Sequence, residues 1–233
     1  MVPSYAISKG RFFGEQEVAQ LEKGVIRTME GILVKNGFEH ISVPSLVTKG
    51  TIWRQGVVPN EKVLSVTPEM ALAGSAEQGI LEYFTGRTVT GWGRIYAENQ
   101  CFRNEESFHR LKTLIEFKKL EMFFFCKESE ATAEFELALK LATQLLDIYG
   151  IKWRTVCLDD EPGYHVKKTD IEVWTEQYGW METHSCTYFG QEQSKRFCMD
   201  GDNNHTISCT AVASPRILIP ILEKRNNPNA HSH

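Results

Sequence analysis

The segment 101–125, CFRNEESFHRLKTLIEFKKLEMFFF, constrains the fold of this chain more than any other. Its first apolar stretch ends in an Arg-x-Glu, Arg103 and Glu105, and a second apolar stretch after a charged turn carries Phe117 and Glu121. Two such stretches joined by a polar turn predict an antiparallel hairpin. Its inward side chains offer a guanidinium for a phosphate, an aromatic face for a planar ring, and carboxylates for an amine or a metal. An edge hairpin with solvated charges is the alternative, and the rest of the chain has to decide between them.

Composition bounds the class of protein. The chain has 233 residues, 42% of them hydrophobic, which is enough for one large domain with a sizeable core. The net charge of −4 argues against a basic nucleic-acid-binding surface, although a few arginines can still bind a small anion. No apolar run could span a bilayer, and the six cysteines contain no C-x-x-C pair, which indicates reduced thiols. We therefore expect a cytoplasmic protein without membrane contact, with one domain over 1–225 and a frayed polar tail over 226–233.

Hydrophobic periodicity predicts a mixture of helices and strands. From Val18 to Leu33 apolar residues recur at helical spacing, and Gly37 follows as a stop signal, so a helix is expected over 15–35. Further helices are expected over 70–84, 131–149 and 216–223, and strands over 38–44, 62–66, 151–158, 169–174, 180–188 and 205–214. The order shows no regular strand–helix–strand rhythm. The predicted class is α+β, a mainly antiparallel sheet flanked by helices.

Three segments occur in a telling order. NGFEHISVPSL (36–46) leads into a proline, the hairpin at 101–125 follows, and HTISCTAVASPRIL (205–218) closes the series. Between them lie Thr67-Pro68-Glu69, DIEVW (170–174) and WMETHSCT (180–187). In this order the segments resemble the three motifs of the class II aminoacyl-tRNA synthetases, and within them the catalytic core of seryl-tRNA synthetase. The likeness runs from about residue 8 to residue 223.

The resemblance implies an ATP-dependent ligase that forms an aminoacyl-adenylate from a small amino acid. It implies that Arg103 binds the α-phosphate and the amino acid carboxylate, and that Glu105 lies near the adenine amino group. Phe117 and Arg216 would enclose the adenine, with the Arg216 fork reaching the γ-phosphate. The residues assigned to catalysis are Arg103, Glu105 and Arg216.

The same resemblance assigns the metal and the amino acid pocket. Glu182 and Ser185 would hold Mg²⁺ against the phosphates, since hard cations prefer oxygen ligands. Thr67 and Glu69 would bind the substrate ammonium, and Glu121 would face the side-chain pocket.

The third motif departs from the seryl pattern. Ser208 stands where an Asn is usual, and Cys209, Ala211 and Pro215 replace glycines, so the pocket floor is reshaped. Related carrier-protein ligases hold the substrate amine with zinc on a Cys-Glu-Cys set. Glu121 and Cys209 match two of those ligands, and Zn²⁺ is ranked below the amine pocket because only one sulfur ligand is left.

These departures bear on the acceptor of the aminoacyl group. The second-motif loop (106–113) is short, and no heptad run precedes the core as in the tRNA-binding arm of seryl enzymes. We therefore expect transfer to an acceptor other than tRNA, such as a carrier protein. A minimal seryl-type synthetase that charges tRNA, and a catalytically silent paralogue that acts as a binding protein, are the alternatives. The first motif also predicts a homodimer.

Overall fold

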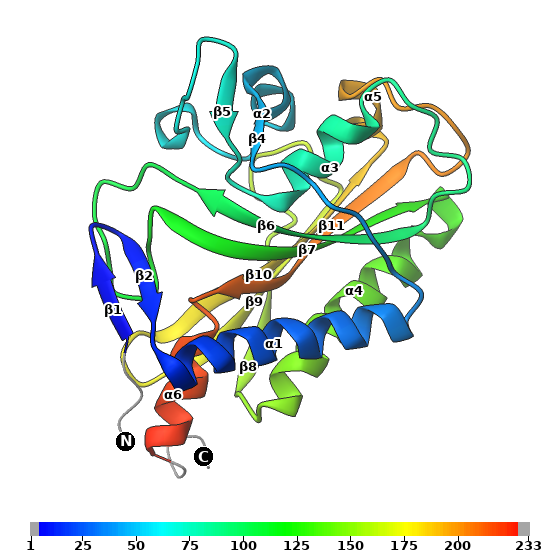
Figure 1. Cartoon of the computed structure of the whole chain (residues 1–233). Helices are drawn as coiled ribbons and strands as arrows, with labels where there is room; N and C mark the ends of the chain where they lie inside the picture. The colour runs from blue at the N-terminus through cyan, green and yellow to red at the C-terminus, as the bar shows by residue number, and fades with distance from the viewer. Residues whose placement is uncertain (1–4, 228–233) are drawn as a thin grey trace.

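A computed structural model describes residues 5–227, and a seven-stranded sheet forms its centre (Figure 1). The strand order is β3-β6-β7-β11-β10-β9-β8, with every neighbouring pair antiparallel except β3 and β6. The strands are β3 (Glu39–His40), β6 (Arg94–Phe102), β7 (Glu116–Cys126), β8 (Trp153–Cys157), β9 (Lys167–Thr175), β10 (Gly179–Gly190) and β11 (His205–Ser214). The predicted α+β class with a mainly antiparallel sheet is confirmed.

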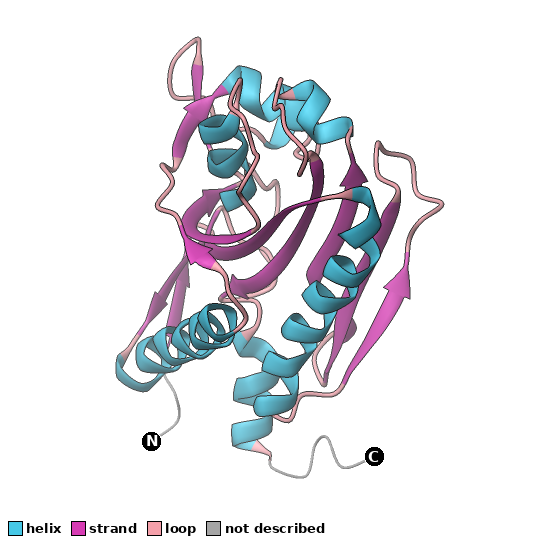
Figure 2. Ribbon diagram, turned by 90° about the vertical axis from the view of Figure 1, so that its right-hand side faces the viewer, coloured by secondary structure: helices cyan, strands magenta, loops and turns pink. Residues whose placement is uncertain are grey.

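Three helices cover one face of this sheet and enclose the main hydrophobic core. They are α1 (Gln16–Lys35), α4 (Glu128–Ile148) and α6 (Leu218–Asn226). Figure 2 shows the two long ones, α1 and α4, on the same side of the strands. The apolar residues whose spacing predicted α1 form the buried stripe of this helix, and that stripe faces the sheet. Among the described residues, no helix is both long and apolar enough to cross a membrane.

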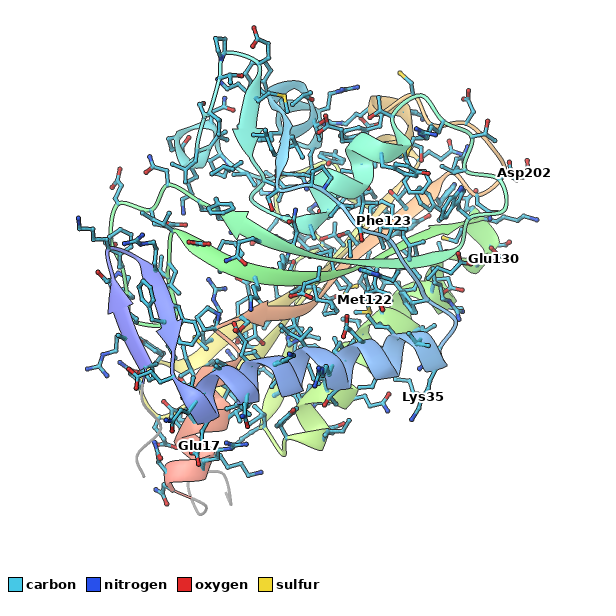
Figure 3. The ribbon with its side chains drawn as sticks, in the orientation of Figure 1. Glu17, Lys35, Met122, Phe123, Glu130 and Asp202 are labelled. Carbon is cyan, nitrogen blue, oxygen red and sulfur yellow. The ribbon has the colours of Figure 1, made fainter. Side chains whose placement is uncertain are left out.

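The opposite face carries α3 (Ala76–Phe84) and α5 (Glu192–Arg196) over a second, smaller core. Successive residues of a strand point to opposite faces, so each central strand contributes to both cores. On β7, Met122 belongs to the core beneath α1, whereas its neighbour Phe123 packs in the core beneath α3 (Figure 3). Alternation along β7 therefore decides which side chains face which layer.

A small separate unit lies beyond α3 at one end of the sheet (Figure 1). It contains β4 (Leu46–Thr48), α2 (Lys49–Gln55), the short 3₁₀ helix η1 (Asn60–Lys62) and β5 (Met70–Leu72). The predicted helix over 70–84 is wrong at its start, because Met70–Leu72 pairs with β4 and the helix begins only after Ser75. The Ser75 hydroxyl caps α3 by accepting a hydrogen bond from Glu77 N at 3.3 Å. The predicted strand over 62–66 is also wrong; only Ser65 makes a bridge there.

The first described residues form a hairpin that was not predicted, β1 (Tyr5–Ser8) and β2 (Arg11–Gly14). It is joined to the loop between β6 and β7 by a hydrogen bond from Ile115 N to Gly10 O at 2.9 Å. The predicted strand over 38–44 shortens to Glu39–His40, and only the Ile41 amide continues the pairing, to Tyr96 O. Most of the tail predicted over 226–233 lies outside the described residues.

Candidate active site

A cavity of about 420 Å³ opens on the face of the sheet that carries α3 and α5. Its floor comes from β7, β10 and β11, and its rim from the β6–β7 loop and the loop between β8 and β9. Eight of the residues assigned from sequence line it: Arg103, Glu105, Phe117, Glu121, Glu182, Ser185, Ser208 and Arg216.

Two arginines from distant parts of the chain meet at one end of the cavity. The Nε and Nη2 atoms of Arg103 donate to Gly74 O at 3.3 and 3.2 Å, and its guanidinium carbon lies 5.4 Å from the centre of the Phe117 ring. Arg216 donates from Nε to Lys112 O at 3.0 Å and from Nη1 to Glu182 O at 3.3 Å. Burial lowers the pKa of Arg216, and the nearby positive charge of Arg103 adds to that shift. Because the two positively charged guanidiniums repel each other, binding of an anion between them is favoured.

Glu105 lies at the same end, on the loop that follows β6. Its carboxylate makes an ion pair with Lys62, with Oε2 3.0 Å from Nζ. The lysine comes from η1 in the small separate unit, so this ion pair joins that unit to the rim of the cavity.

An acidic cluster also lines the cavity. Glu121 is only 2% exposed; its Oε1 accepts a hydrogen bond from Ser208 Oγ at 3.0 Å, and its Oε2 lies 2.7 Å from Lys119 Nζ. Glu77 on α3 is buried beside it and accepts a hydrogen bond from Gln193 Nε2 at 2.5 Å. Burial, and then the charge of Glu121, raise the pKa of Glu77 to about 7. Two buried carboxylates share one lysine here, which favours binding of a further cation.

Glu77 was missed by the sequence analysis, which assigned Thr67 and Glu69 to this role. Both residues are exposed on the turn before β5 and neither lines the cavity, so the structure does not bring them into this site. The Thr67 hydroxyl is used locally, donating to Glu69 Oε2 at 3.4 Å. The signal that could have found the site is the same hydroxyl-x-carboxylate spacing eight residues later, Ser75 and Glu77, at a helix start.

An oxygen-rich corner forms where β9 and β10 pair. Ser185 lies opposite Asp170 in the register, and Glu182 lies on the same strand as Ser185. Burial raises the pKa of Asp170, and its buried Oδ1 has no hydrogen-bond partner in the structure. A carboxylate, a hydroxyl and an orphaned carboxylate oxygen fit a hard divalent cation that takes its other ligands from water or phosphate. Within 5–227 there is no group of three or more His, Cys, Asp or Glu side chains that could hold a metal ion.

The structure does not bring together Glu121 and Cys209, the pair ranked second as Zn²⁺ ligands. Glu121 faces the cavity, where Ser208 bonds it. Cys209 pairs with Met122 in the register and is fully buried with it in the core beneath α1. Neighbouring residues of a strand point to opposite faces, so the sheet itself separates the two side chains. Cys209 therefore behaves as a small buried apolar residue.

Comparisons with known proteins point in one direction. The family described as "tRNA synthetase class II core domain (G, H, P, S and T)" matches residues 66–225. Serine--tRNA ligase of Deinococcus radiodurans is 30% identical over 230 residues, which cover 89% of this chain and 54% of that protein. The mitochondrial serine--tRNA ligase of Mus musculus is 28% identical over 239 residues, covering 88% and 45%. The chain thus spans about half the length of the curated relatives it matches.

Solved structures agree in fold. Seryl-tRNA synthetase from Pyrococcus horikoshii, complexed with ATP, superposes with a TM-score of 0.82 at 21% identity, covering 92% of this chain and 53% of that one. Prolyl-tRNA synthetase from Giardia lamblia, in complex with prolyl-adenylate, gives a TM-score of 0.79 at 15% identity, covering 91% and 47%. At such identities the likeness concerns the fold.

Proposed function

The chain belongs to the class II tRNA synthetase core domain family (G, H, P, S and T), and on that premise we propose that it activates a small amino acid with ATP as an aminoacyl-adenylate. The observation that carries the proposal is one cavity lined by two groups of opposite charge. Arg103 and Arg216 offer an anion site, and Glu77 and Glu121 offer a cation site. A zwitterionic amino acid beside a nucleotide triphosphate matches that distribution of charge.

The reaction forms one bond and breaks another at the α-phosphorus of ATP. A carboxylate oxygen of the amino acid attacks the phosphorus, and pyrophosphate leaves with the bonding electrons. Both reactants are anions, so the protein has to bring them together and offset the charge that builds up. Arg103 is suited to this because its fork is already oriented by Gly74 O and the Phe117 ring. Arg216 would act on the phosphates, with Phe117 as a surface on which the adenine stacks.

The substrate ammonium would be held at the acidic end. Glu77 and Glu121 are buried with only Lys119 near both, so an incoming ammonium supplies the missing positive charge. Its arrival favours the ionised form of Glu77. Ser208 and Glu105 both line the cavity, and in this proposal Ser208 would form part of the pocket wall and Glu105 would lie near the adenine.

The relatives' chemistry and the oxygen-rich corner support Mg²⁺ as the metal. Glu182 and Ser185 would hold it, with the unpartnered Asp170 oxygen close by. Bound there, the ion would neutralise negative charge on the phosphates.

Amino-acid-dependent exchange of labelled pyrophosphate into ATP, run across the twenty amino acids, tests the activation step. We expect exchange with at least one small amino acid and a loss of at least about 100-fold in Arg216→Ala. Arg225→Ala, an exposed arginine on α6, the helix that follows Arg216, is the matched control and should keep full exchange. If no amino acid supports exchange at saturating ATP and Mg²⁺, the silent-paralogue alternative replaces this proposal.

The acceptor is a separate part of the proposal. The altered third motif and the acidic balance support a non-tRNA acceptor such as the thiol of a carrier protein, whereas the printed names of the relatives support tRNA. Incubating the enzyme with labelled amino acid and ATP, with either total tRNA or a phosphopantetheinylated carrier protein, distinguishes them. Label on the carrier supports the first candidate. Label on tRNA that falls steeply with added salt supports the second.

We also infer a homodimer. Val34 is 59% exposed and Leu46 is 41% exposed, and they flank the first-motif segment 36–46. Exposed apolar side chains around one segment favour burial against a second copy. Light scattering at micromolar concentration should give twice the chain mass, and a monomer would contradict the inference.

A further inference from the structure

One aromatic residue closes the acidic end of the cavity. Tyr164 belongs to the loop 158–166 between β8 and β9, and it lines the cavity together with Phe189 and Val57. Neither the sequence motifs nor the chemistry proposed above uses this residue. Its surroundings show why it can act as a wall.

Tyr164 is held from three sides by three different elements. Its ring stacks on Phe189 of β10, with 5.1 Å between ring centres and an interplanar angle of 30°. The guanidinium carbon of Arg196 on α5 lies 3.8 Å from the centre of the Tyr164 ring, and its hydroxyl donates to Gln55 O on α2 at 2.5 Å. Stacking, cation–π contact and a hydrogen bond together make the ring costly to displace.

Arg196, whose guanidinium packs on the Tyr164 ring, is itself held in place by two hydrogen bonds. Arg196 Nε donates to Glu192 Oε1 at 3.0 Å, and Nη1 donates to Arg54 O at 3.3 Å. The wall therefore links α2, α5 and β10, and a large substrate cannot push it aside by rotating one free side chain.

The wall also lies close to the proposed ammonium site. The charge of Glu77 contributes to a raised pKa of Tyr164, after the larger effect of burial. Gln193 acts on both groups: it donates to Glu77 Oε1 and it opposes the shift in the pKa of Tyr164. An amino acid held by its ammonium at Glu77 would therefore have this ring as one wall of the space open to its side chain.

We infer that Tyr164 is a specificity-determining residue, whose ring restricts the substrate to amino acids with small side chains. The inference rests on the proposed function and deepens it by naming the residue that sets the size limit of the substrate side chain. The discrimination is steric, so it should grow with the volume of the substrate side chain. A wall that excludes one or two methylene groups typically discriminates by roughly 10- to 200-fold in kcat/KM.

Pyrophosphate exchange with a graded series of amino acids, from glycine and alanine through valine to leucine and phenylalanine, tests the wall. Tyr164→Ala should raise kcat/KM for the larger members, relative to the best small one, by at least about tenfold. Tyr164→Phe keeps the ring and loses only the hydrogen bond, so its selectivity should match the wild type. Tyr83→Ala, an exposed tyrosine on α3 outside the cavity, is the matched control and should change nothing.

The same series of variants distinguishes three outcomes: a folding defect, failure of the proposed role of Tyr164, and failure of the proposed activity. Thermal melts of every variant show whether it is folded at the assay temperature. If Tyr164→Ala is unfolded at that temperature, Tyr164→Trp tests the wall by enlarging it. This variant should lower kcat/KM most for the largest amino acid that the wild type accepts. Exchange by the wild type with unchanged selectivity in the folded variants overturns the role of Tyr164 and leaves the activity standing. No exchange by the wild type with any amino acid overturns both.

Discussion

At the scale of single residues, Glu77 is the group whose charge depends most on what the cavity holds. Burial raises its pKa from 4.5 to about 7, so the folded protein binds a proton more tightly than the unfolded chain does. Stability therefore falls as pH rises through the window from about 4.5 to about 7. His184 works in the opposite direction, because burial lowers its pKa from 6.5 to about 4 and stability is lost as pH falls through that range. A variant of Glu77 is therefore needed to separate its contribution to the pH dependence of stability from that of His184.

Glu77→Gln keeps the shape of the side chain and removes the titration. We expect the variant to gain up to about 3 kcal/mol relative to wild type between pH 4.5 and pH 7.5, measured by urea unfolding at each pH. Glu69→Gln, on the exposed turn, should show the same pH dependence as the wild type. Equal pH dependence in Glu77→Gln and the wild type would show that Glu77 is ionised in the folded protein across this range.

Unlike an ordinary surface arginine, Arg103 has a guanidinium whose orientation is fixed by neighbouring groups. Lysine keeps the charge but lacks the fork that Gly74 O and the Phe117 ring hold in place. We expect Arg103→Lys to lose about 100-fold or more in kcat for pyrophosphate exchange, with an unchanged melting temperature. Arg11→Lys is the control, an exposed arginine that also lies over a phenylalanine ring, Phe13. Full activity in Arg103→Lys would mean that charge alone suffices.

At the scale of elements, the β1–β2 hairpin supports the loop between β6 and β7. Gly10, at the turn of the hairpin, has φ +70° and packs under Phe108 of that loop. A Cβ atom there would lie 2.5 Å from Phe108 Cε1, closer than any real contact allows. The loop carries residues of the cavity rim, Leu111 and Lys112 among them, so the hairpin positions the rim from outside.

Gly10→Ala tests this support. Backbone strain at positive φ costs about 1 kcal/mol, and moving the exposed Phe108 ring should add about 1 kcal/mol more. Gly86→Ala is the matched control, since Gly86 also has φ +70° but nothing lies within 4 Å of an added Cβ. Urea unfolding should show the larger loss in Gly10→Ala. Equal losses would mean that Phe108 does not rest on the hairpin.

At the scale of the whole molecule, a ligand that joins the two ends of the cavity should stabilise the entire fold. The cavity draws residues from β7, β10, β11, α3 and both rim loops, so binding there couples all of them. Binding at one hundred times the dissociation constant adds about 2.7 kcal/mol to the free energy of unfolding.

ATP with Mg²⁺ should therefore raise the melting temperature of the wild type, and ATP without the metal should raise it less. We expect Arg216→Ala to abolish the shift and Glu182→Gln to remove its dependence on Mg²⁺, as followed by differential scanning fluorimetry. Arg225→Ala should behave like the wild type. A shift of equal size in Arg216→Ala would place the nucleotide elsewhere on the molecule.

Local pattern was enough for the architecture and for half of the site. The apolar spacing of α1, the strand at His205–Ser214 and the hairpin that bears Arg103 and Glu121 could all be read from the chain, because period and turn chemistry are local properties. The order of the motifs was enough to predict the family that the comparisons bear out.

Three features had to wait for the tertiary structure: the presence of Glu77 rather than Glu69 in the cavity, the separation of Cys209 from Glu121, and the position of Tyr164 on the cavity wall. Each depends on which strand pairs with which and in what register. A hydroxyl-x-carboxylate pattern looks alike on an exposed turn and at a capped helix start, and only the packing of the surrounding elements brings one of them into the cavity. Sequence spacing records neighbours along the chain, whereas charge, burial and exclusion of water arise between residues that are distant along it.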